Sequence, residues 1–417
     1  MTQLPDEQKG NALTNLNAVR SVLLMIALLS ATLGMCGEAL ITPGADQMFK
    51  HFENDNFVNF LLSGPNLVSM FASITAGIIG RYIDKKYVLT FGMALFVAGG
   101  VFGMAIDNPG YMIFMRCLVG LALGFTNVTA ISIITSMYED DNRRSRMIGI
   151  LNAGMYTMGM VITIVSGWVC ELFGWKAMFN LYALGIISIL LVILFIPRIK
   201  ADIRVEEESH GPESGLKGWK FKLAVMCVGY WILQVSYAMI IFFVSVYSDE
   251  TGLGGPAYAG VMTAVIHAGA LAGALCFGFV YPKLKRYSMA AGMVLFLVGY
   301  IILILLPYTT TVMIGCVILG FALATAFSQL LMRAGIIAPK KSVSVSVGIS
   351  AAAMGFGYFA STFIMTFLKT IIGVDSMLEV MPYVFVANVV LMIVTFIYIT
   401  VTNKKEKVEM DAAQEQA

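Results

Sequence analysis

Long apolar stretches, separated by short polar segments, run through almost the whole chain. Residues 87–106, 177–197 and 380–403 carry no charged side chain, and a bilayer takes about 20 helical residues to cross. Further apolar stretches fall at 21–43, 57–80, 111–135, 147–169, 222–247, 257–281 and 343–368. The uncharged run 287–332 is too long for one span, and Pro307 with the threonines after it divides the run in two. The pattern predicts twelve transmembrane helices.

Composition supports the same class. Hydrophobic residues make up 59% of the 417 residues and charged residues 12%, whereas soluble proteins have about 25% charged residues. This excludes a soluble enzyme, a nucleic-acid-binding protein and a disordered chain. Membrane β-barrel strands alternate in polarity, and these runs do not. We therefore expect an all-α membrane protein.

The six cysteines lie in or beside apolar runs, so we interpret them as buried apolar residues and expect no metal and no cofactor.

The basic residues predict the orientation of the helices. With the N-terminus inside, 23 of the 27 Lys and Arg residues fall on the inner side, as cytoplasmic loops require. The exceptions are Lys50, Arg116, Lys176 and Lys369. Both termini are therefore expected in the cytoplasm, in a multi-pass protein of the plasma membrane.

The longest inner connection, residues 198–220, is polar and contains three consecutive glutamates. It divides the chain into two halves that resemble each other. Gly149-Ile150, for example, recurs 199 residues later as Gly348-Ile349. Internal repeats of this kind are typical of secondary transporters. The expected domains are a cytoplasmic tail 1–20, a six-helix bundle 21–197, a cytoplasmic loop 198–220, a second six-helix bundle 221–402 and a tail 403–417.

Polar side chains follow several of the predicted helices at helical spacing. Such side chains are costly in a bilayer and usually face the bundle interior or a wet cavity. The alternative is that they form hydrogen bonds between packed helices. We expect them to line a solute cavity, whose candidates are Asn66, Asn127, Asn152, Tyr156, Tyr230, Gln234, Tyr237, Thr263, Gln329 and Arg333.

Two charged residues lie well inside predicted spans. Glu38 and Arg116 are each about five residues from the outer end of their helix, which at 1.5 Å per residue places them at similar depth. They can couple transport to protons, form a permanent ion pair or contact the solute. His267 is the third candidate for proton coupling, because its unperturbed pKa is about 6.5. Its alternative role is that of a hydrogen-bonded core residue.

Three sequence motifs indicate a family. Gly80, Asp84, Lys85 and Lys86 form a short basic loop between the second and third spans. Arg116, Gly120 and Gly124 follow an RxxxG pattern. The fifth span contains Gly154, Gly159 and Gly167, with Thr163-Ile164 where a Gly-Pro pair is usual. Together they resemble the major facilitator superfamily, and in particular its twelve-helix drug or metabolite:proton antiporters.

The resemblance covers residues 21 to 402 and implies the major facilitator fold: two pseudo-repeated six-helix bundles that rock about a central site. It also implies that Gly80, Asp84, Lys85 and Lys86 form a gating loop. In this reading Asp84 caps the N-terminus of the helix at 343–368 and latches the two halves together.

These features predict a secondary active transporter that moves a small organic solute by alternating access, coupled to protons. We expect a monomer in the lipid bilayer, without a nucleic-acid partner. Export is favoured by the resemblance of the fourth and fifth spans. The alternative is uptake or exchange of an organic anion, which fits Arg116, His267 and Arg333. A membrane-embedded enzyme or a channel is less well supported, because no nucleophile with its base and no selectivity motif is present.

Overall fold

A computed structural model describes residues 21–52, 54–80, 82–106, 108–137, 141–198, 218–284, 287–339 and 342–415. The expected tail 1–20 and nearly all of the loop 198–220 lie outside these residues. In chain order the elements are the first helix Ser21–Met35 with its last turn η1 Thr32–Met35, η2 Thr42–Gly44, α2 Ala45–His51, α3 Asp55–Ile79, α4 Lys85–Val101, η3 Phe102–Met104, α5 Pro109–Met137, α6 Asp141–Phe173, η4 Trp175–Leu184, α7 Gly185–Phe195, α8 Trp219–Phe242, α9 Val244–Glu250, α10 Pro256–Leu284, α11 Ser288–Leu305, α12 Thr309–Ile337, α13 Val343–Ile372 and α14 Met377–Glu415.

The twelve-helix prediction is confirmed. Eleven helices are long and apolar enough to cross a membrane, and the shorter apolar helix Ser21–Met35 is the twelfth. None of the described residues lies in a strand. The last helix, α14, continues to Glu415 through the segment expected as a tail.

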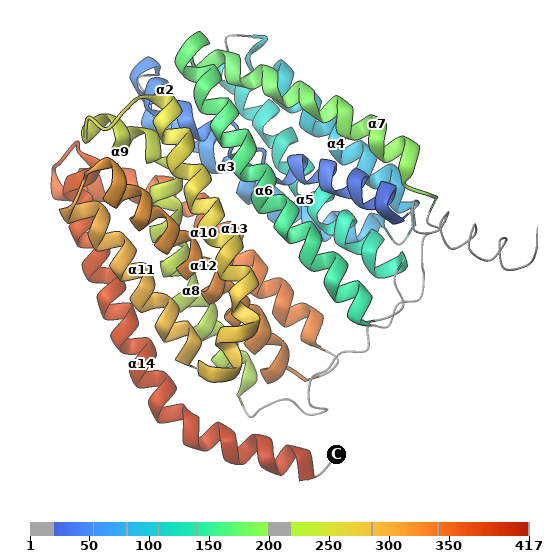
Figure 1. The fold of residues 1–417 in the computed structure, drawn as a ribbon, viewed down its shortest axis with the longest axis vertical. Helices are drawn as coiled ribbons and strands as arrows, with labels where there is room; N and C mark the ends of the chain where they lie inside the picture. The colour runs from blue at the N-terminus through green and yellow to red at the C-terminus, as the bar shows by residue number, and fades with distance from the viewer. Residues whose placement is uncertain are drawn as a thin grey trace, which may run out of the picture.

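The helices form two bundles that follow the two halves of the chain. In Figure 1 the helices from the first to α7, coloured blue to green, lie on one side, and α8 to α14, coloured yellow-green to red, lie on the other. The bundles meet along two pairs of helices, α6 with α10 and α3 with α13. The short helices α2 and α9 lie together at one end of the molecule, and the C-terminus lies at the opposite end (Figure 1). We call these the α2–α9 end and the terminal end.

Glycines allow the helices to approach closely. In α10, Gly269 and Gly273 each lie against a backbone carbonyl of α12, and Gly320 of α12 lies against the Ile266 carbonyl of α10. Between the bundles, Gly167 of α6 and Gly260 of α10 make the same kind of contact. Small residues at such positions are how membrane helices gain packing contacts without a hydrophobic driving force between them.

The first span is interrupted, where the sequence predicted a continuous helix over 21–43. The helix ends at Met35, Cys36–Ile41 form turns, and α2 begins at Ala45. Pro43 lacks a backbone N–H and disfavours helical conformation in the residue before it. Gly37 lets this irregular backbone lie against α5, since a Cβ there would be 2.9 Å from Val119 Cγ1. The seventh span is also divided, at Phe243 between α8 and α9.

The close α10–α12 contact predicts a difference between two glycine substitutions. A Cβ at Gly320 would lie 1.9 Å from the Ile266 carbonyl oxygen, whereas a Cβ at Gly77 would have no atom within 4 Å. Gly320→Ala should therefore destabilise the protein by about 1–3 kcal/mol. Gly77→Ala is the control, and its better helix propensity should leave stability unchanged or raised. Thermal unfolding in detergent, followed by size-exclusion chromatography, measures both. Equal unfolding midpoints for the two variants would contradict the close α10–α12 contact.

Candidate functional site

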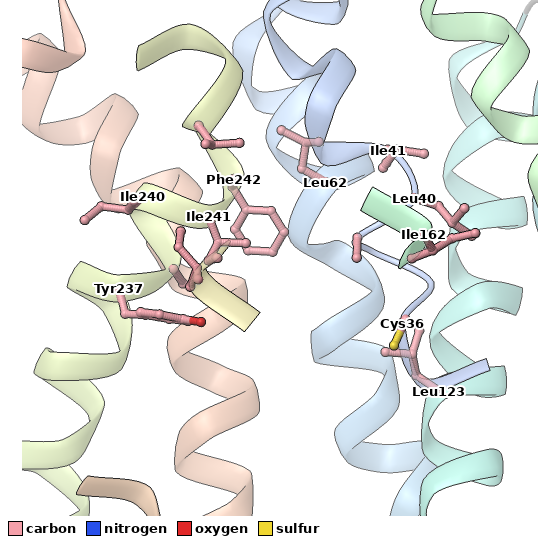
Figure 2. Packing of buried hydrophobic residues seen from close by; sticks show 14 of the residues in the cluster. Cys36, Leu40, Ile41, Leu62, Leu123, Ile162, Tyr237, Ile240, Ile241 and Phe242 are labelled. Carbon is pink, nitrogen blue, oxygen red and sulfur yellow. The ribbon is translucent and has the colours of Figure 1, made fainter. Parts of the chain in front are cut away.

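The interruption of the first span places Glu38 inside the N-terminal bundle. Glu38 lies in the turns between Cys36 and Ile41 rather than on a helix. Its carboxylate accepts a hydrogen bond from the Asn66 side-chain amide of α3. Figure 2 shows this irregular segment, with Cys36, Leu40 and Ile41 along it, between the helices of the N-terminal bundle. The structure thus brings together two of the residues that the sequence predicted for the site.

Arg116 lies nearby, on α5, and is only 1% exposed. Its Nε donates to the Leu61 carbonyl at 2.6 Å and its Nη1 donates to the Tyr182 hydroxyl at 2.8 Å. Its Nη2 has no hydrogen-bond partner. Arg116 interacts electrostatically with Glu38, but these two described residues have no N–O distance within the 4.0 Å of an ion pair. The permanent ion pair considered from the sequence is therefore not formed in this conformation.

Four tyrosines from both bundles surround the same region. Tyr156 of α6, Tyr230 and Tyr237 of α8 and Tyr358 of α13 interact electrostatically with one another, and Tyr237 and Tyr358 also with Glu38. The rings of Tyr237 and Tyr358 are 6.4 Å apart, edge to face. In Figure 2 the Tyr237 hydroxyl is directed toward the N-terminal helices. The carboxylate and the tyrosines form one polar cluster at the interface of the bundles.

Gln234 adds an amide to the cluster. It is fully buried on α8, and its Oε1 accepts a hydrogen bond from Tyr230 at 2.7 Å. Its Nε2 has no partner. Asn127 of α5 and Asn152 of α6 are exposed, and their place in the solute cavity stays a prediction.

The remaining predicted residues have other surroundings. His267 Nδ1 lies 2.8 Å from the Thr263 carbonyl on its own helix, and its ring packs against Gly159 of α6. The Thr263 hydroxyl bonds back to Ala259. Gln329 accepts a hydrogen bond from Ser288 of α11, so it joins two helices of one bundle. Polar spacing along a helix could not separate these residues from the cluster, because both roles use the same residue types.

Arg333 is buried, with 9% of its surface exposed. It lies on α12, toward the terminal end of that helix. Its place in the solute cavity stays a prediction.

The loop that includes Gly80 makes contacts within the N-terminal bundle. Asp84 caps its own helix, since its side chain accepts a hydrogen bond from the Lys86 N–H of α4. Lys85 donates to Ser136 on α5 and Lys86 to the Ile193 carbonyl on α7. The resemblance implied that Asp84 caps the helix at 343–368. The structure describes Asp84 at the start of α4, and the two lysines tie three helices of one bundle together. The latch between the two halves stays a prediction.

Tyr182 was missed from the sequence, because its span 177–197 carries few other polar residues. Its hydroxyl accepts from Arg116 and donates to the Gly37 carbonyl, beside Glu38. Tyr358 was also not among the predicted site residues. Both are aromatic residues in apolar helices, where only the fold shows that their hydroxyls are directed inward.

An ion-pair cluster joins the bundles at the α2–α9 end. Lys50 Nζ lies 2.9 Å from an Asp46 oxygen on α2 and 2.8 Å from an Asp249 oxygen on α9. The Asp46 N–H donates to the Ser245 hydroxyl at 2.9 Å. Both inter-bundle contacts join positions 199 residues apart, the repeat distance of the sequence. Equivalent positions of the two halves therefore meet here, beside a cavity of about 250 Å³.

The pKa values of Lys50 and Asp46 in this cluster are shifted by their surroundings. Hydrogen bonds to Asp249 and Asp46 raise the pKa of Lys50. Burial raises the pKa of Asp46, an effect that the hydrogen bond from Lys50 opposes. A lysine whose pKa is higher in the folded than in the unfolded protein stabilises the fold at pH values below its unfolded-state pKa. This stabilisation is lost only as the pH rises through the folded-state pKa. Lys50 therefore keeps its charge at physiological pH.

Further contacts close the same end. Phe49 stacks on Phe243, with ring centroids 5.3 Å apart. Glu171 of α6 accepts from the Ala257 N–H of α10 at 2.9 Å. Ser63 of α3 bonds to α13. Glu250, beside Asp249, instead accepts hydrogen bonds from three groups at the start of α14, those of Ser376, Met377 and Leu378.

The terminal end is different. Gly77 of α3, Gly149 of α6 and Gly348 of α13 lie toward this end, and a Cβ added at any of them would have no atom within 4 Å. These are the helices that pair the two bundles. The described polar contacts between the bundles thus lie toward the α2–α9 end, and these three glycines have open space beside them.

Comparison with known proteins identifies the family. The family model "Major Facilitator Superfamily" matches residues 27–359. The chain belongs to this superfamily. The resemblance inferred from the motifs and the fold class inferred from the spans are both confirmed. Membership of this superfamily agrees with the prediction of a secondary transporter rather than an enzyme.

Among curated members of the superfamily, the arabinose-proton symporter of Escherichia coli K12 is 26% identical over 153 residues, 35% of this chain and 32% of that protein. The galactose-proton symporter of the same strain is 29% identical over 126 residues, 30% of this chain and 27% of that protein. The matched stretch is thus about a third of the length of these relatives.

Solved structures match over more of the chain. A mutant of the nucleoside transporter NupG superposes with a TM-score of 0.72 at 15% identity, covering 89% of this chain and 99% of that one. A bacterial homologue of the human lysosomal transporter Spinster, solved in an inward-facing, unoccupied conformation, gives 0.68 at 18% identity, covering 90% and 95%. At these identities the likeness concerns the fold.

The ion-pair cluster predicts how the α2–α9 end opens. Lys50→Gln removes the exposed ion pair with Asp249 of the other bundle, which contributes up to about 1 kcal/mol, so this end should open more often. A Ser245→Cys thiol, almost buried when the end is closed, should then react about 3- to 10-fold faster with a charged maleimide. Lys369→Gln, a charge change without a described ion pair, is the control. Unchanged reactivity after Lys50→Gln would show that the ion pairs do not hold this end closed.

Proposed function

We propose that this chain is a proton-coupled transporter of a small, uncharged, polar organic solute. The observation that carries the proposal is the position of Glu38. It lies in a non-helical part of the first span, near Arg116 but not paired with it, and beside tyrosines of both bundles. A residue placed in this way responds both to a proton and to the relative position of the bundles.

Glu38 has the properties that proton coupling needs. A buried charge is costly unless it is paired, so an unpaired carboxyl in this place favours binding a proton. Contact with a guanidinium favours release of that proton. Arg116 itself cannot serve as the carrier, because arginine stays protonated in proteins. Movement of Glu38 between Asn66 and Arg116 is thus the exchange that we assign to proton binding and release. His267, hydrogen-bonded to Thr263, is not needed for this step.

The chemistry of the cluster favours an uncharged solute. The groups that it presents at the bundle interface are the tyrosine hydroxyls and the Gln234 amide, which hydrogen-bond to hydroxyl and amide groups. The tyrosine rings also stack on rings of a solute. Arg116 is fully buried and already hydrogen-bonded, so it is not offered to a solute anion. This argues against the organic-anion alternative. Relatives described as arabinose- and galactose-proton symporters support the uncharged class.

Two directions of transport have support. The fifth-span motif favours export, and a relative described as a multidrug transporter of Aspergillus fumigatus, 23% identical over 142 residues, agrees with it. Proton-driven uptake is the second candidate, and the symporter relatives favour it. Solute and proton cross in opposite directions in the first case and together in the second, so a vesicle assay with an imposed pH gradient separates them.

We assign the α2–α9 end to the outside of the cell and the terminal end to the cytoplasm, on the distribution of Lys and Arg. The conformation described is then inward-open, and the Lys50 cluster is the outer gate. Alternating access requires that this gate open while the terminal end closes.

The orientation predicts which positions an impermeant thiol reagent reaches. Asn54→Cys and Asp375→Cys, both exposed, should react in intact cells. Ser214→Cys, outside the described residues, should react only after lysis. Labelling of the Ser214→Cys variant in intact cells would overturn the orientation and the assignment of the gate.

Glu38→Gln tests the coupling itself. Glutamine imitates the protonated acid, so the variant should lose accumulation of solute driven by a pH gradient, in either direction. It should keep downhill exchange, which requires no proton. Reconstituted vesicles and a panel of uncharged sugars, nucleosides and polyols measure both activities. Glu379→Gln, an exposed acid at the start of α14, is the control. Normal gradient-driven accumulation by Glu38→Gln would exclude Glu38 as the coupling residue.

A further inference from the structure

Tyr182 joins the two charged residues of the proposed proton site through the backbone. It belongs to η4 in the sixth span and is completely buried. Its hydroxyl oxygen accepts a hydrogen bond from Arg116 Nη1 at 2.8 Å, and its proton goes to the Gly37 carbonyl. Gly37 directly precedes Glu38. One hydroxyl thus holds both the guanidinium and the non-helical segment that carries the carboxyl.

The ring of Tyr182 has almost no freedom to move. It lies over Gly100 of α4, where a Cβ would be only 1.9 Å from the ring's Cγ. Phe96 of α4 contacts it from one side, with centroids 4.8 Å apart, and Phe179 stacks at 6.1 Å. The position of the hydroxyl is therefore determined by packing rather than by its own hydrogen bonds.

The charge of Arg116 shows why this position matters. Its described acceptors are the Leu61 carbonyl and the Tyr182 hydroxyl, and its Nη2 has none. When Glu38 is ionised, its carboxylate can balance the guanidinium. When Glu38 is protonated, none of the described residues is known to supply a negative charge to Arg116, and the buried cation then depends on the dipoles that remain. Tyr182 is the side chain that supplies one of them.

We propose that Tyr182 is a positioning residue that stabilises Arg116 while Glu38 is protonated, and so sets the pH at which Glu38 exchanges its proton. The inference rests on the proposed coupling role of Glu38. The groups that face Glu38 are Asn66 of α3, Arg116 of α5, Tyr182 of η4, Tyr237 of α8, Tyr358 of α13 and, in its own segment, Cys36. Arg116 is the one of these that carries a fixed charge.

Tyr182→Phe keeps the ring and removes the hydroxyl. Arg116 then loses an acceptor, so the state with ionised Glu38 gains an advantage. A hydrogen bond to a charged group contributes enough free energy to shift the pH midpoint of Glu38 protonation by about one unit. The midpoint of Glu38 protonation should therefore fall by about one pH unit. Infrared difference spectroscopy of the purified protein measures this midpoint from the carboxylic C=O band, which is assigned by its loss in Glu38→Gln.

Tyr247→Phe is the matched control. Tyr247 is also buried, and its hydroxyl donates to the Leu303 carbonyl at 2.8 Å, but within the C-terminal bundle. It should leave the midpoint unchanged. Arg116→Gln provides a second test: in its background, Tyr182→Phe should no longer shift the midpoint, because the charge that Tyr182 stabilises is absent.

The outcomes separate this inference from the proposed function. A wild-type Glu38 band that titrates, with the same midpoint in Tyr182→Phe, overturns the role of Tyr182 and leaves proton coupling intact. A shift of equal size with and without Arg116 also overturns it, because Tyr182 would then act through Gly37 alone. A wild-type Glu38 that does not titrate between pH 4 and 10 overturns the proposed coupling, and this inference with it. A lower midpoint that requires Arg116 supports it.

Discussion

A chain that leaves the helical conformation inside a bilayer must find other partners for its backbone groups, because no water supplies them. This constraint governs the segment Cys36–Ile41. Its amides make short-range bonds, such as Ala39 N–H to the Cys36 carbonyl and Ile41 N–H to the Glu38 carbonyl. Its free carbonyls are taken by side chains of other helices: the Gly37 carbonyl by Tyr182 and the Leu40 carbonyl by Ser166. The interruption is therefore held by the fifth and sixth spans.

The same arrangement explains where the chemistry is concentrated. A side chain on a regular helix has its backbone fixed by its neighbours four residues away, whereas Glu38 lies in turns that depend on distant contacts. Asn66, Tyr182 and the tyrosines of α8 and α13 approach this one segment from different helices. Movement of either bundle changes those contacts and with them the surroundings of the carboxyl. Arg116 is buried on a regular helix, so its positive charge stays in place while the surroundings of the Glu38 carboxyl change.

Sequence patterns predicted the spans well, because the hydropathy of each stretch depends on that stretch alone. They also identified Glu38, Arg116 and the polar positions of α8. The break after Met35 was not predicted, since its cause is packing of Gly37 against α5 as well as local composition. Gln329 and Thr263 were assigned to a cavity, and that assignment stays a prediction, because a polar residue in a helix has the same sequence signal whether it faces a solute or a neighbouring helix. Lys85 and Lys86 were expected to belong to a gating loop, which stays a prediction. Their described contacts depend on the ends of α5 and α7, which no local pattern shows.

Asp249 and Glu250 are adjacent in the chain but bind to different halves of the molecule. Glu250 holds α9 to the start of α14 with three hydrogen bonds, while Asp249 meets Lys50, whose side chain is 61% exposed. In the proposed opening, α9 stays with the C-terminal bundle, and the solvent-exposed bond between Lys50 and Asp249 is among those that break. Exposed ion pairs are screened by salt, with a Debye length of about 8 Å at physiological ionic strength. The ionic strength of the medium on that side of the membrane thus acts on the rate of opening without any change in the solute or the proton gradient.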